Sequence, residues 1–169
     1  DKGNYEGAYA YYETLSKVAT SKDNKSVGQL GMLRSAYLLK GNDEVVSAAG
    51  KLLADKKISS AVADEARFYR GKALLNLKQN DLAIADLTQV AKDTRTAFGA
   101  ESQYLIAETY LKDKLYDKAE KQVLVFMKEG TTHQYWMARA VIVLSDVYAA
   151  KGDKFQARQY LESLQANYK

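Results

Sequence analysis

The sequence predicts an all-α fold, built as a right-handed α-α superhelix of antiparallel helix pairs. The first supporting observation is that the 169 residues contain no proline, which favours uninterrupted helices. The second is that apolar residues recur with a period close to 3.6, for example along residues 66–77 and 83–91. The third is an internal repeat with a period of about 37 residues, which is typical of stacked helical units.

Two columns of residues set the register of this repeat. Small or branched residues follow each turn, and mostly aromatic residues precede it. Both columns keep the same spacing to within one residue of the period, so their agreement makes a chance pattern improbable. The first column is Ala8, Val46, Ala83, Ala119 and Ala157, and the second is Tyr37, Leu74, Tyr110 and Tyr148.

The individual helices follow in order from these signals. The first segment is interpreted as the second helix of a pair whose first helix is absent. Ser26 and Gln29 form a capping box that starts the next helix, and Asn42 and Asp153 are placed to cap the second helices of their pairs. Because every connection is short, consecutive helices are expected to be antiparallel neighbours. The predicted helices are 4–20, 26–40, 43–56, 60–78, 81–93, 97–113, 116–129, 133–151 and 154–168.

Two antiparallel helices per unit resemble the tetratricopeptide repeat (TPR). The last unit matches best, with Ser145 in the small position of its first helix and the turn at Gly152 and Asp153. The resemblance implies one repeat array over residues 1–169, with a half repeat at 1–22 and repeats at about 23–58, 59–94, 95–131 and 132–169. It also implies a set of structural packing residues, namely Gly71, Ala83, Ala107, Tyr110, Ala119, Ser145, Tyr148 and Ala157.

The sequence departs from the family pattern in several places. Arg34 and Val46 occupy positions that the family keeps small, and Lys78 and Lys114 replace the glycine of the turn. The closing proline is absent, and the period is longer than that of the family. These departures affect the first complete repeat most, while the small residues of the later repeats still allow paired helices to approach closely.

The amino-acid composition excludes several kinds of catalytic and metal site. There is no cysteine and only one histidine, His133, so neither a thiolate nucleophile nor a cysteine or polyhistidine metal site can form. No phosphate-binding glycine loop, zinc-protease motif or calcium loop occurs. We therefore expect no enzymatic activity, no cofactor and no metal.

Charge and hydropathy limit the kinds of partner and the cellular location that we expect. The 25 basic and 21 acidic residues are interleaved rather than clustered, which argues against nucleic-acid binding, and no apolar stretch is long enough to cross a membrane. Residues 135–161 are also similar to terminal repeats of long multi-repeat proteins of the bacterial cell envelope. That similarity implies a periplasmic or envelope-associated protein, and a cytoplasmic scaffold is the alternative.

A stripe along the predicted first helices is the candidate partner-binding site. In tandem helix pairs these helices line the concave surface, where Phe68 and Tyr104 would form an aromatic pair on adjacent helices, flanked by both charge signs. The competing interpretation is that the two rings only pack against each other or a neighbouring helix. The charges are expected to pair across repeats as Lys72 with Glu108 and Arg139 with Glu101, or to bind a ligand. The full stripe is Glu65, Phe68, Lys72, Glu101, Tyr104, Glu108, Arg139, Ile142 and Asp146.

Two function classes remain. The first is a non-enzymatic protein-interaction scaffold that binds a peptide or protein segment on the concave surface. The second is a structural or regulatory repeat segment of a larger protein whose function lies in other domains. The chain is expected to be a fragment of a longer protein, because no polar capping helix follows Leu161, Leu164 and Tyr168. Self-association through apolar repeat ends is a further expectation.

Overall fold

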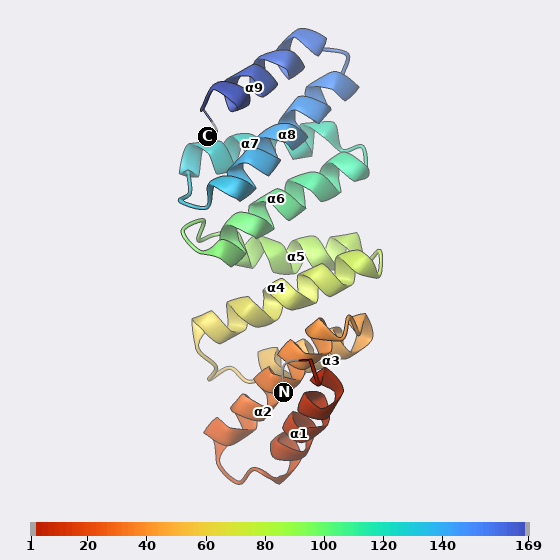
Figure 1. The fold of residues 1–169 in the computed structure, drawn as a ribbon, viewed down its shortest axis with the longest axis vertical. Helices are drawn as coiled ribbons and strands as arrows, with labels where there is room; N and C mark the ends of the chain where they lie inside the picture. The colour runs from red at the N-terminus through yellow and green to blue at the C-terminus, as the bar shows by residue number, and fades with distance from the viewer. Residues whose placement is uncertain (1–2, 168–169) are drawn as a thin grey trace. The chain divides into compact units, whose positions relative to one another are not determined.

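Residues 3–167 are described by this computed structural model, and within them the chain forms nine α-helices and no strand (Figure 1). This confirms the predicted all-helical fold. The predicted end of the last helix, including Tyr168, lies outside the described residues. The helices are α1 (Tyr5–Val18), α2 (Lys22–Leu38), α3 (Asn42–Ala54), α4 (Ser60–Asn76), α5 (Asn80–Val90), α6 (Ala97–Lys112), α7 (Tyr116–Glu129), α8 (Gln134–Ala150) and α9 (Lys154–Asn167).

The helix starts correct two of the predicted caps. Helix α2 begins four residues earlier than predicted, because the Ser21 hydroxyl already accepts a hydrogen bond from the Asn24 backbone N–H. Ser26 therefore lies inside the helix, and the capping-box prediction is wrong. Asn42 is not a cap either, since α3 starts from Gly41 without a side-chain cap. Asp153 does cap α9, by accepting a 2.9 Å hydrogen bond from the backbone N–H of Gln156.

The chain divides into two compact units, residues 1–86 and 87–169, with the boundary inside α5. In the first unit, α2 packs against α1 and α3, and α3 packs against α4. The buried apolar side chains of its core come from α2, α3 and α4, and half-buried tyrosines of α1 cover them. The core residues are Met32, Leu33, Ala36, Val45, Ala48, Ala49, Leu52, Ala66 and Ala73, with Tyr9 and Tyr12 packed against them.

The core of the second unit lies between α6, α7 and α8, and α9 packs against α8. Small residues allow these helices to approach closely. Ser145 of α8 and Ala157 of α9 are both buried, and the Ser145 hydroxyl donates a 2.9 Å hydrogen bond to the Ala157 carbonyl. The core residues are Ala100, Tyr104, Ala107, Ala119, Val123, Phe126, Ala140, Val143, Leu144 and Val147, with Tyr110, Tyr148 and Tyr160 half-buried against them. The first unit buries Gly71 and Ala83 in the same way.

A residue with positive φ follows the first helix of every complete pair. Lys40, Lys78, Lys114 and Gly152 have φ values of 59°, 62°, 59° and 88°. In each turn the next residue donates its backbone N–H to a carbonyl five residues back, as Gly41 does to Ala36, which is the Schellman pattern. Lysine therefore adopts the left-handed conformation that the family gives to glycine.

These turns correct the register of the first complete repeat by one residue. Sequence reasoning aligned Gly41 with Gly152, whereas the turn geometry aligns Lys40 with Gly152. Val45, which is 1% exposed, therefore occupies the small position that was assigned to Val46. By the same shift the buried Leu33 takes the position assigned to Arg34, and Ala36 replaces Tyr37 in the column before the turn.

The strained turns predict a stabilising substitution. Lys114→Gly should raise the free energy of unfolding by about 1 kcal/mol, because a left-handed conformation costs a non-glycine residue about that much. Lys121→Gly, at an exposed position inside α7, should instead lower it by about 1 kcal/mol. Urea denaturation followed by circular dichroism measures both changes. Changes of the same sign in the free energy of unfolding would contradict the left-handed turn at Lys114.

The small position of α7 predicts a destabilising substitution. Ala119 has no exposed surface, so Ala119→Leu should force neighbouring helices apart and lower the free energy of unfolding by about 1–3 kcal/mol. Lys121→Leu adds the same side chain at an exposed position of the same helix and should change stability by less than about 0.5 kcal/mol. Thermal melting of both variants tests the register, since an unchanged Ala119→Leu curve would place this residue at the surface.

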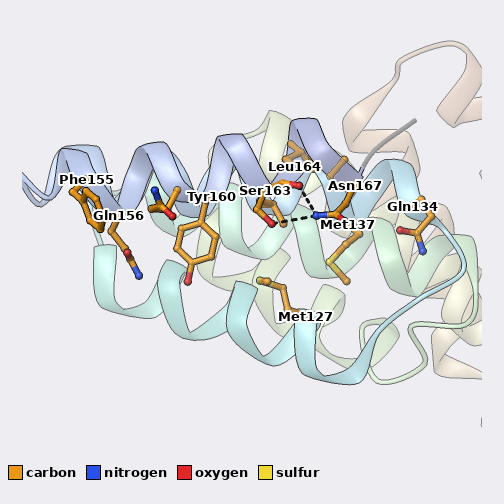
Figure 2. A pocket seen from close by; sticks show the side chains of 12 residues that line it. Met127, Gln134, Met137, Phe155, Gln156, Tyr160, Ser163, Leu164 and Asn167 are labelled. Carbon is orange, nitrogen blue, oxygen red and sulfur yellow. Dashed lines mark hydrogen bonds between the residues drawn. The ribbon is translucent and has the colours of Figure 1, made fainter.

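Helices α7 and α9 both pack against α8. Met127 of α7 and Tyr160 of α9 face a groove between these two helices, whose floor is α8 (Figure 2).

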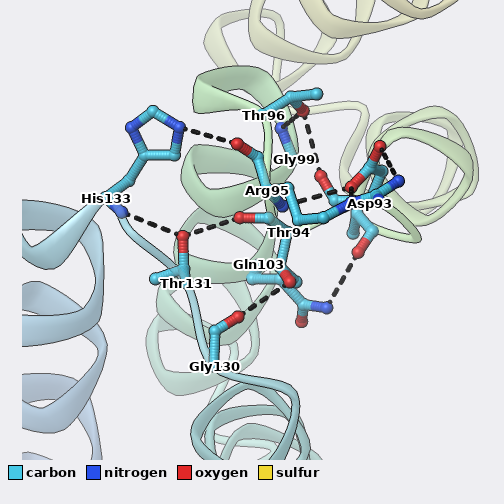
Figure 3. A network of polar contacts seen from close by, with 10 residues as sticks. Asp93, Thr94, Arg95, Thr96, Gly99, Gln103, Gly130, Thr131 and His133 are labelled. Carbon is cyan, nitrogen blue, oxygen red and sulfur yellow. Dashed lines mark hydrogen bonds and ion pairs between the residues drawn. The ribbon is translucent and has the colours of Figure 1, made fainter.

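Two loops of the second unit are joined by a polar network (Figure 3). The Thr94 hydroxyl donates to the Gly130 carbonyl at 2.8 Å, and the Thr131 hydroxyl donates back to the Thr94 carbonyl at 2.6 Å. His133 Nε2 lies 3.0 Å from the Arg95 carbonyl oxygen. The single histidine therefore holds the loop before α8 against the loop before α6, which is a structural role.

Candidate interaction surface

The most accessible part of the predicted stripe lies on α8. Tyr135, Arg139, Ile142 and Asp146 follow one another at spacings that place them on one side of this helix. Tyr135 is 54% exposed, Ile142 is 43% exposed and Asp146 is exposed. We refer to these four residues as the α8 face, which combines an aromatic ring, a cation, an aliphatic side chain and an anion.

Arg139 is held in place by its neighbours. Its guanidinium lies 4.6 Å from the ring centroid of Tyr104 and 5.9 Å from that of Tyr135, in cation–π contact with both. It also donates hydrogen bonds to both phenol oxygens, and one of its nitrogens lies 3.8 Å from a Glu108 carboxylate oxygen. The charge is therefore fixed in direction before any partner arrives, which lowers the entropy that binding would cost.

The sequence stripe did not include Tyr135 or Trp136, although both build this surface. Trp136 stacks on Tyr104 with ring centroids 5.5 Å apart, and Tyr135 meets Trp136 edge-on at 4.8 Å. Helical spacing could have identified Tyr135, because it precedes Arg139 by four residues on the same face. Trp136 points toward the preceding first helix, and only the packing of α6 against α8 reveals its contact.

The two rings that the sequence assigned as exposed anchors are buried. Phe68 is 2% exposed and Tyr104 is 4% exposed, so neither forms the open apolar pair that was expected. Phe68 lies beside Tyr69 and beneath the ammonium of Lys72, which is 5.1 Å from its ring centroid. Trp136 and Arg139 cover Tyr104. The competing interpretation of packed rings describes both side chains better.

In the first unit, Glu65 is engaged within the chain rather than offered to a ligand. It is buried, and its two oxygens accept hydrogen bonds of 2.6 and 2.8 Å from Arg34 of the preceding first helix. The corrected register explains this bidentate pair, because Arg34 occupies the repeat position of Lys72, Glu108 and Asp146. Lys72 lies over the ring of Tyr37 as well as that of Phe68.

Two charge pairs run diagonally between neighbouring first helices. Arg139 pairs with Glu108, and Arg34 pairs with Glu65 in the same manner, whereas the predicted pair of Arg139 with Glu101 stays a prediction. The two pairs are diagonal because the start of the stripe on one first helix lies beside the end of the stripe on the helix before it. Glu101 is half-buried on α6. Lys72 and Glu108 belong to different units, so their pairing stays a prediction.

The contacts around Tyr104 change two ionisation equilibria. Burial, and then the hydrogen bond that Tyr104 donates to Glu108, raises the pKa of Tyr104 to about 12. Burial alone would raise the pKa of Glu108, but hydrogen bonds from Lys112 and Tyr104 outweigh it and hold that pKa below its usual value. The carboxylate therefore stays charged and able to orient Arg139.

These shifts predict a loss of stability in alkali. The folded-state pKa of Tyr104 exceeds the ordinary value of 10.0, so its contribution is fully present below pH 10 and is lost as the pH rises through about 12. Urea midpoints of the wild type should therefore fall more steeply between about pH 10 and pH 12 than those of Tyr104→Phe, which has no phenol at this site. Parallel declines in the two proteins would contradict the raised pKa.

Among residues 3–167, no group of three or more histidine, cysteine, aspartate or glutamate side chains is arranged to hold a metal ion. Within the same range, no helix is both long and apolar enough to span a bilayer.

The fold is that of TPR-like helical repeats. A crystal structure of MamA has a TM-score of 0.78 and covers 98% of this chain and 89% of that one at 19% identity. A crystal structure of nearly identical TPR-like repeats from a putative kinesin light chain of Podosopora anserina has a TM-score of 0.73, with 97% and 87% covered at 17% identity. No family model matches the sequence, and the search of curated proteins found no match. At these identities the likeness concerns the fold alone.

Proposed function

We propose that this chain is a non-enzymatic scaffold that binds a segment of a partner protein on the α8 face. The observation that carries the proposal is the fixed position of Arg139 between the exposed Tyr135 and Ile142. Tyrosine and arginine are the side chains that contribute most often to binding energy at protein interfaces. TPR-like folds are typically scaffolds, which supports the same function at the level of the fold.

The chemistry of the α8 face restricts the partner segment. Ile142 and Tyr135 offer apolar area, so the segment needs at least one apolar side chain to cover them. Arg139 favours a carboxylate or carbonyl group on the partner, and Asp146, two turns further along the helix, favours a basic group. Two other stripe residues, Tyr104 and Glu108, position Arg139 in this proposal. Lys72 and Glu101 are proposed as further contacts, whereas the buried Glu65 and Phe68 are not.

The proposal is tested with two variants of matched exposure. Ile142→Asp places a carboxylate on the α8 face, and Leu124→Asp does the same on α7, where the leucine is 41% exposed against 43% for Ile142. Both proteins are used as bait in pull-downs from native extract, with the captured proteins quantified by mass spectrometry. A partner of the α8 face should be lost at least about tenfold by Ile142→Asp and retained by Leu124→Asp.

If both variants capture every protein as the wild type does, the proposed binding surface is wrong. The alternative would then be favoured, in which the chain is a structural or regulatory repeat segment of a larger protein.

The placement of this scaffold at a bacterial cell envelope is also a proposal. It is supported by the similarity of residues 135–161 to terminal repeats of envelope proteins, and fractionation of the source cells tests it against a cytoplasmic location. Self-association stays a prediction as well. Phe155 and Leu161 of α9 are 72% and 46% exposed, and sedimentation at rising concentration measures whether copies associate.

A further inference from the structure

A second surface of the second unit has the features of a peptide site, and it does not depend on the α8 face. A groove of about 520 Å³ runs between α7 and α9 over α8 (Figure 2). This volume falls within the usual range for ligand sites, about 300–1,000 Å³. The groove uses a different side of α8 from Ile142. Its apolar lining is Met127, Met137, Ala138, Val141, Phe155, Tyr160 and Leu164.

One repeat earlier in the same unit, in the layer formed by α6 and α7, a pair of glutamines occupies the equivalent position. Gln103 of α6 precedes Val141 by one repeat, and Gln122 of α7 precedes Tyr160 by the same interval. Gln122 donates a hydrogen bond to Gln103, which in turn donates to the Ala91 carbonyl at 3.0 Å and to Glu129 at 3.1 Å. In the last repeat Val141 and Tyr160 replace this glutamine pair. The equivalent position is therefore an open apolar groove rather than a set of hydrogen-bonded polar side chains.

The rim of the groove carries amides and a hydroxyl and no charge. The amide nitrogens of three rim residues donate within the chain, Gln134 to the Thr131 carbonyl at 2.8 Å, Gln159 to Glu162 at 3.4 Å and Asn167 to the Ser163 carbonyl at 2.7 Å. Each of these amide nitrogens has two N–H groups and each amide oxygen can accept, so the rim residues offer a ligand both donors and acceptors. A matching ligand is uncharged and supplies both N–H donors and carbonyl acceptors beside apolar groups.

We propose that this α7–α9 groove binds an extended, uncharged peptide segment with apolar side chains. A peptide backbone supplies N–H donors along its length, whereas a fatty acyl chain of similar volume supplies none. The groove follows α9 from Phe155 to Asn167, about 18 Å at 1.5 Å per residue, which accommodates about five or six residues of extended chain. Met127 and Met137 suit such a site because methionine adapts its shape to different apolar side chains.

The chain contains three methionines, which makes a direct experiment possible. With ¹³C-labelled methionine methyl groups, Met127 and Met137 report on the groove, and the buried Met32 of the first unit serves as the internal reference. The probe is the peptide acetyl-Ser-Leu-Ser-Phe-Ser-Leu-amide. A peptide with glutamate in place of its three apolar residues tests the requirement for apolar side chains, and decanoate tests an acyl ligand. The apolar peptide should produce saturable shifts of Met127 and Met137 and none of Met32.

Three variants identify the site. Val141→Gln with Tyr160→Gln copies the glutamine pair of the preceding layer, which the fold already accommodates, and should weaken peptide binding at least about tenfold. Phe155→Ala changes a side chain that is 72% exposed, so it leaves the core intact and should weaken binding at least about threefold. Ile142→Gln, the matched control on the α8 face, should bind the peptide within about twofold of the wild type.

Three results would overturn the proposal: no saturable shift with the apolar peptide, saturable shifts with decanoate alone, or wild-type affinity in both the glutamine double variant and Phe155→Ala. Because Ile142→Gln alters only the α8 face, its effects on a captured partner and on the peptide separate failure of this proposal from failure of the proposed scaffold function.

Discussion

Replacing Phe126 with alanine should lower the free energy of unfolding by about 3–5 kcal/mol. Phe126 has no exposed surface and is the largest fully buried side chain among the described residues. It lies in the core where α7 meets α6 and α8, so its removal leaves a cavity that the three helices cannot close without moving. Urea denaturation followed by circular dichroism measures the loss.

The matched control for this prediction is Leu124→Ala. Leu124 lies two residues earlier on the same helix and is 41% exposed, so its truncation should cost less than about 1 kcal/mol. Comparable losses in the two variants would show that α7 presents a different face to the core.

Replacing Gly99 with alanine should also destabilise the protein strongly. A Cβ atom at this position would lie 1.9 Å from the backbone carbonyl oxygen of Asp93, and a backbone atom cannot swing aside as a side chain can. The loop before α6 would have to move, together with the Thr96 hydroxyl that accepts a hydrogen bond from Gly99 and caps the helix. Overpacking of this kind costs about 1–3 kcal/mol or more.

Gly50→Ala is the opposite case within the same fold. Gly50 lies inside α3, and a Cβ atom added there would have no neighbouring atom within 4 Å, so alanine meets no obstacle. This substitution should stabilise the protein by about 0.5–1 kcal/mol, because alanine loses less conformational entropy than glycine on entering a helix. Thermal melts that move in opposite directions for Gly99→Ala and Gly50→Ala are the expected result, and a shared direction would contradict the close approach at Gly99.

Because of the polar network between the two loops, Gly99→Ala should also affect binding. The loop that would have to move contains Thr94 and Arg95, which bind Thr131 and His133 before α8 (Figure 3). The α8 face and the α7–α9 groove both depend on the position of α8. Moderate destabilisation at Gly99 should therefore weaken binding at both surfaces together, unlike Ile142→Gln, which should affect only one.

The sequence by itself determined the helices of this protein. Their ends lie within a few residues of the predicted ones because the signals are local: the absence of proline, the helical period of the apolar residues and caps such as Asp153 act over one or two turns. The absence of cysteine likewise excluded disulfide and cysteine–metal chemistry without any knowledge of packing. The candidate stripe was also identified locally, and it includes the three residues Arg139, Ile142 and Asp146 of the α8 face.

The tertiary structure alone decided which of those residues are accessible and how they pair. Tyr104 is buried because Trp136, almost a full repeat away in sequence, stacks on it, and no periodicity within α6 records that contact. The first repeat was misaligned because Lys40, not glycine, takes the left-handed turn, a conformation that the residue type does not favour and that the surrounding helices impose. Local sequence sets which residues share one face of a helix, whereas burial and ion pairing depend on side chains that only folding brings together.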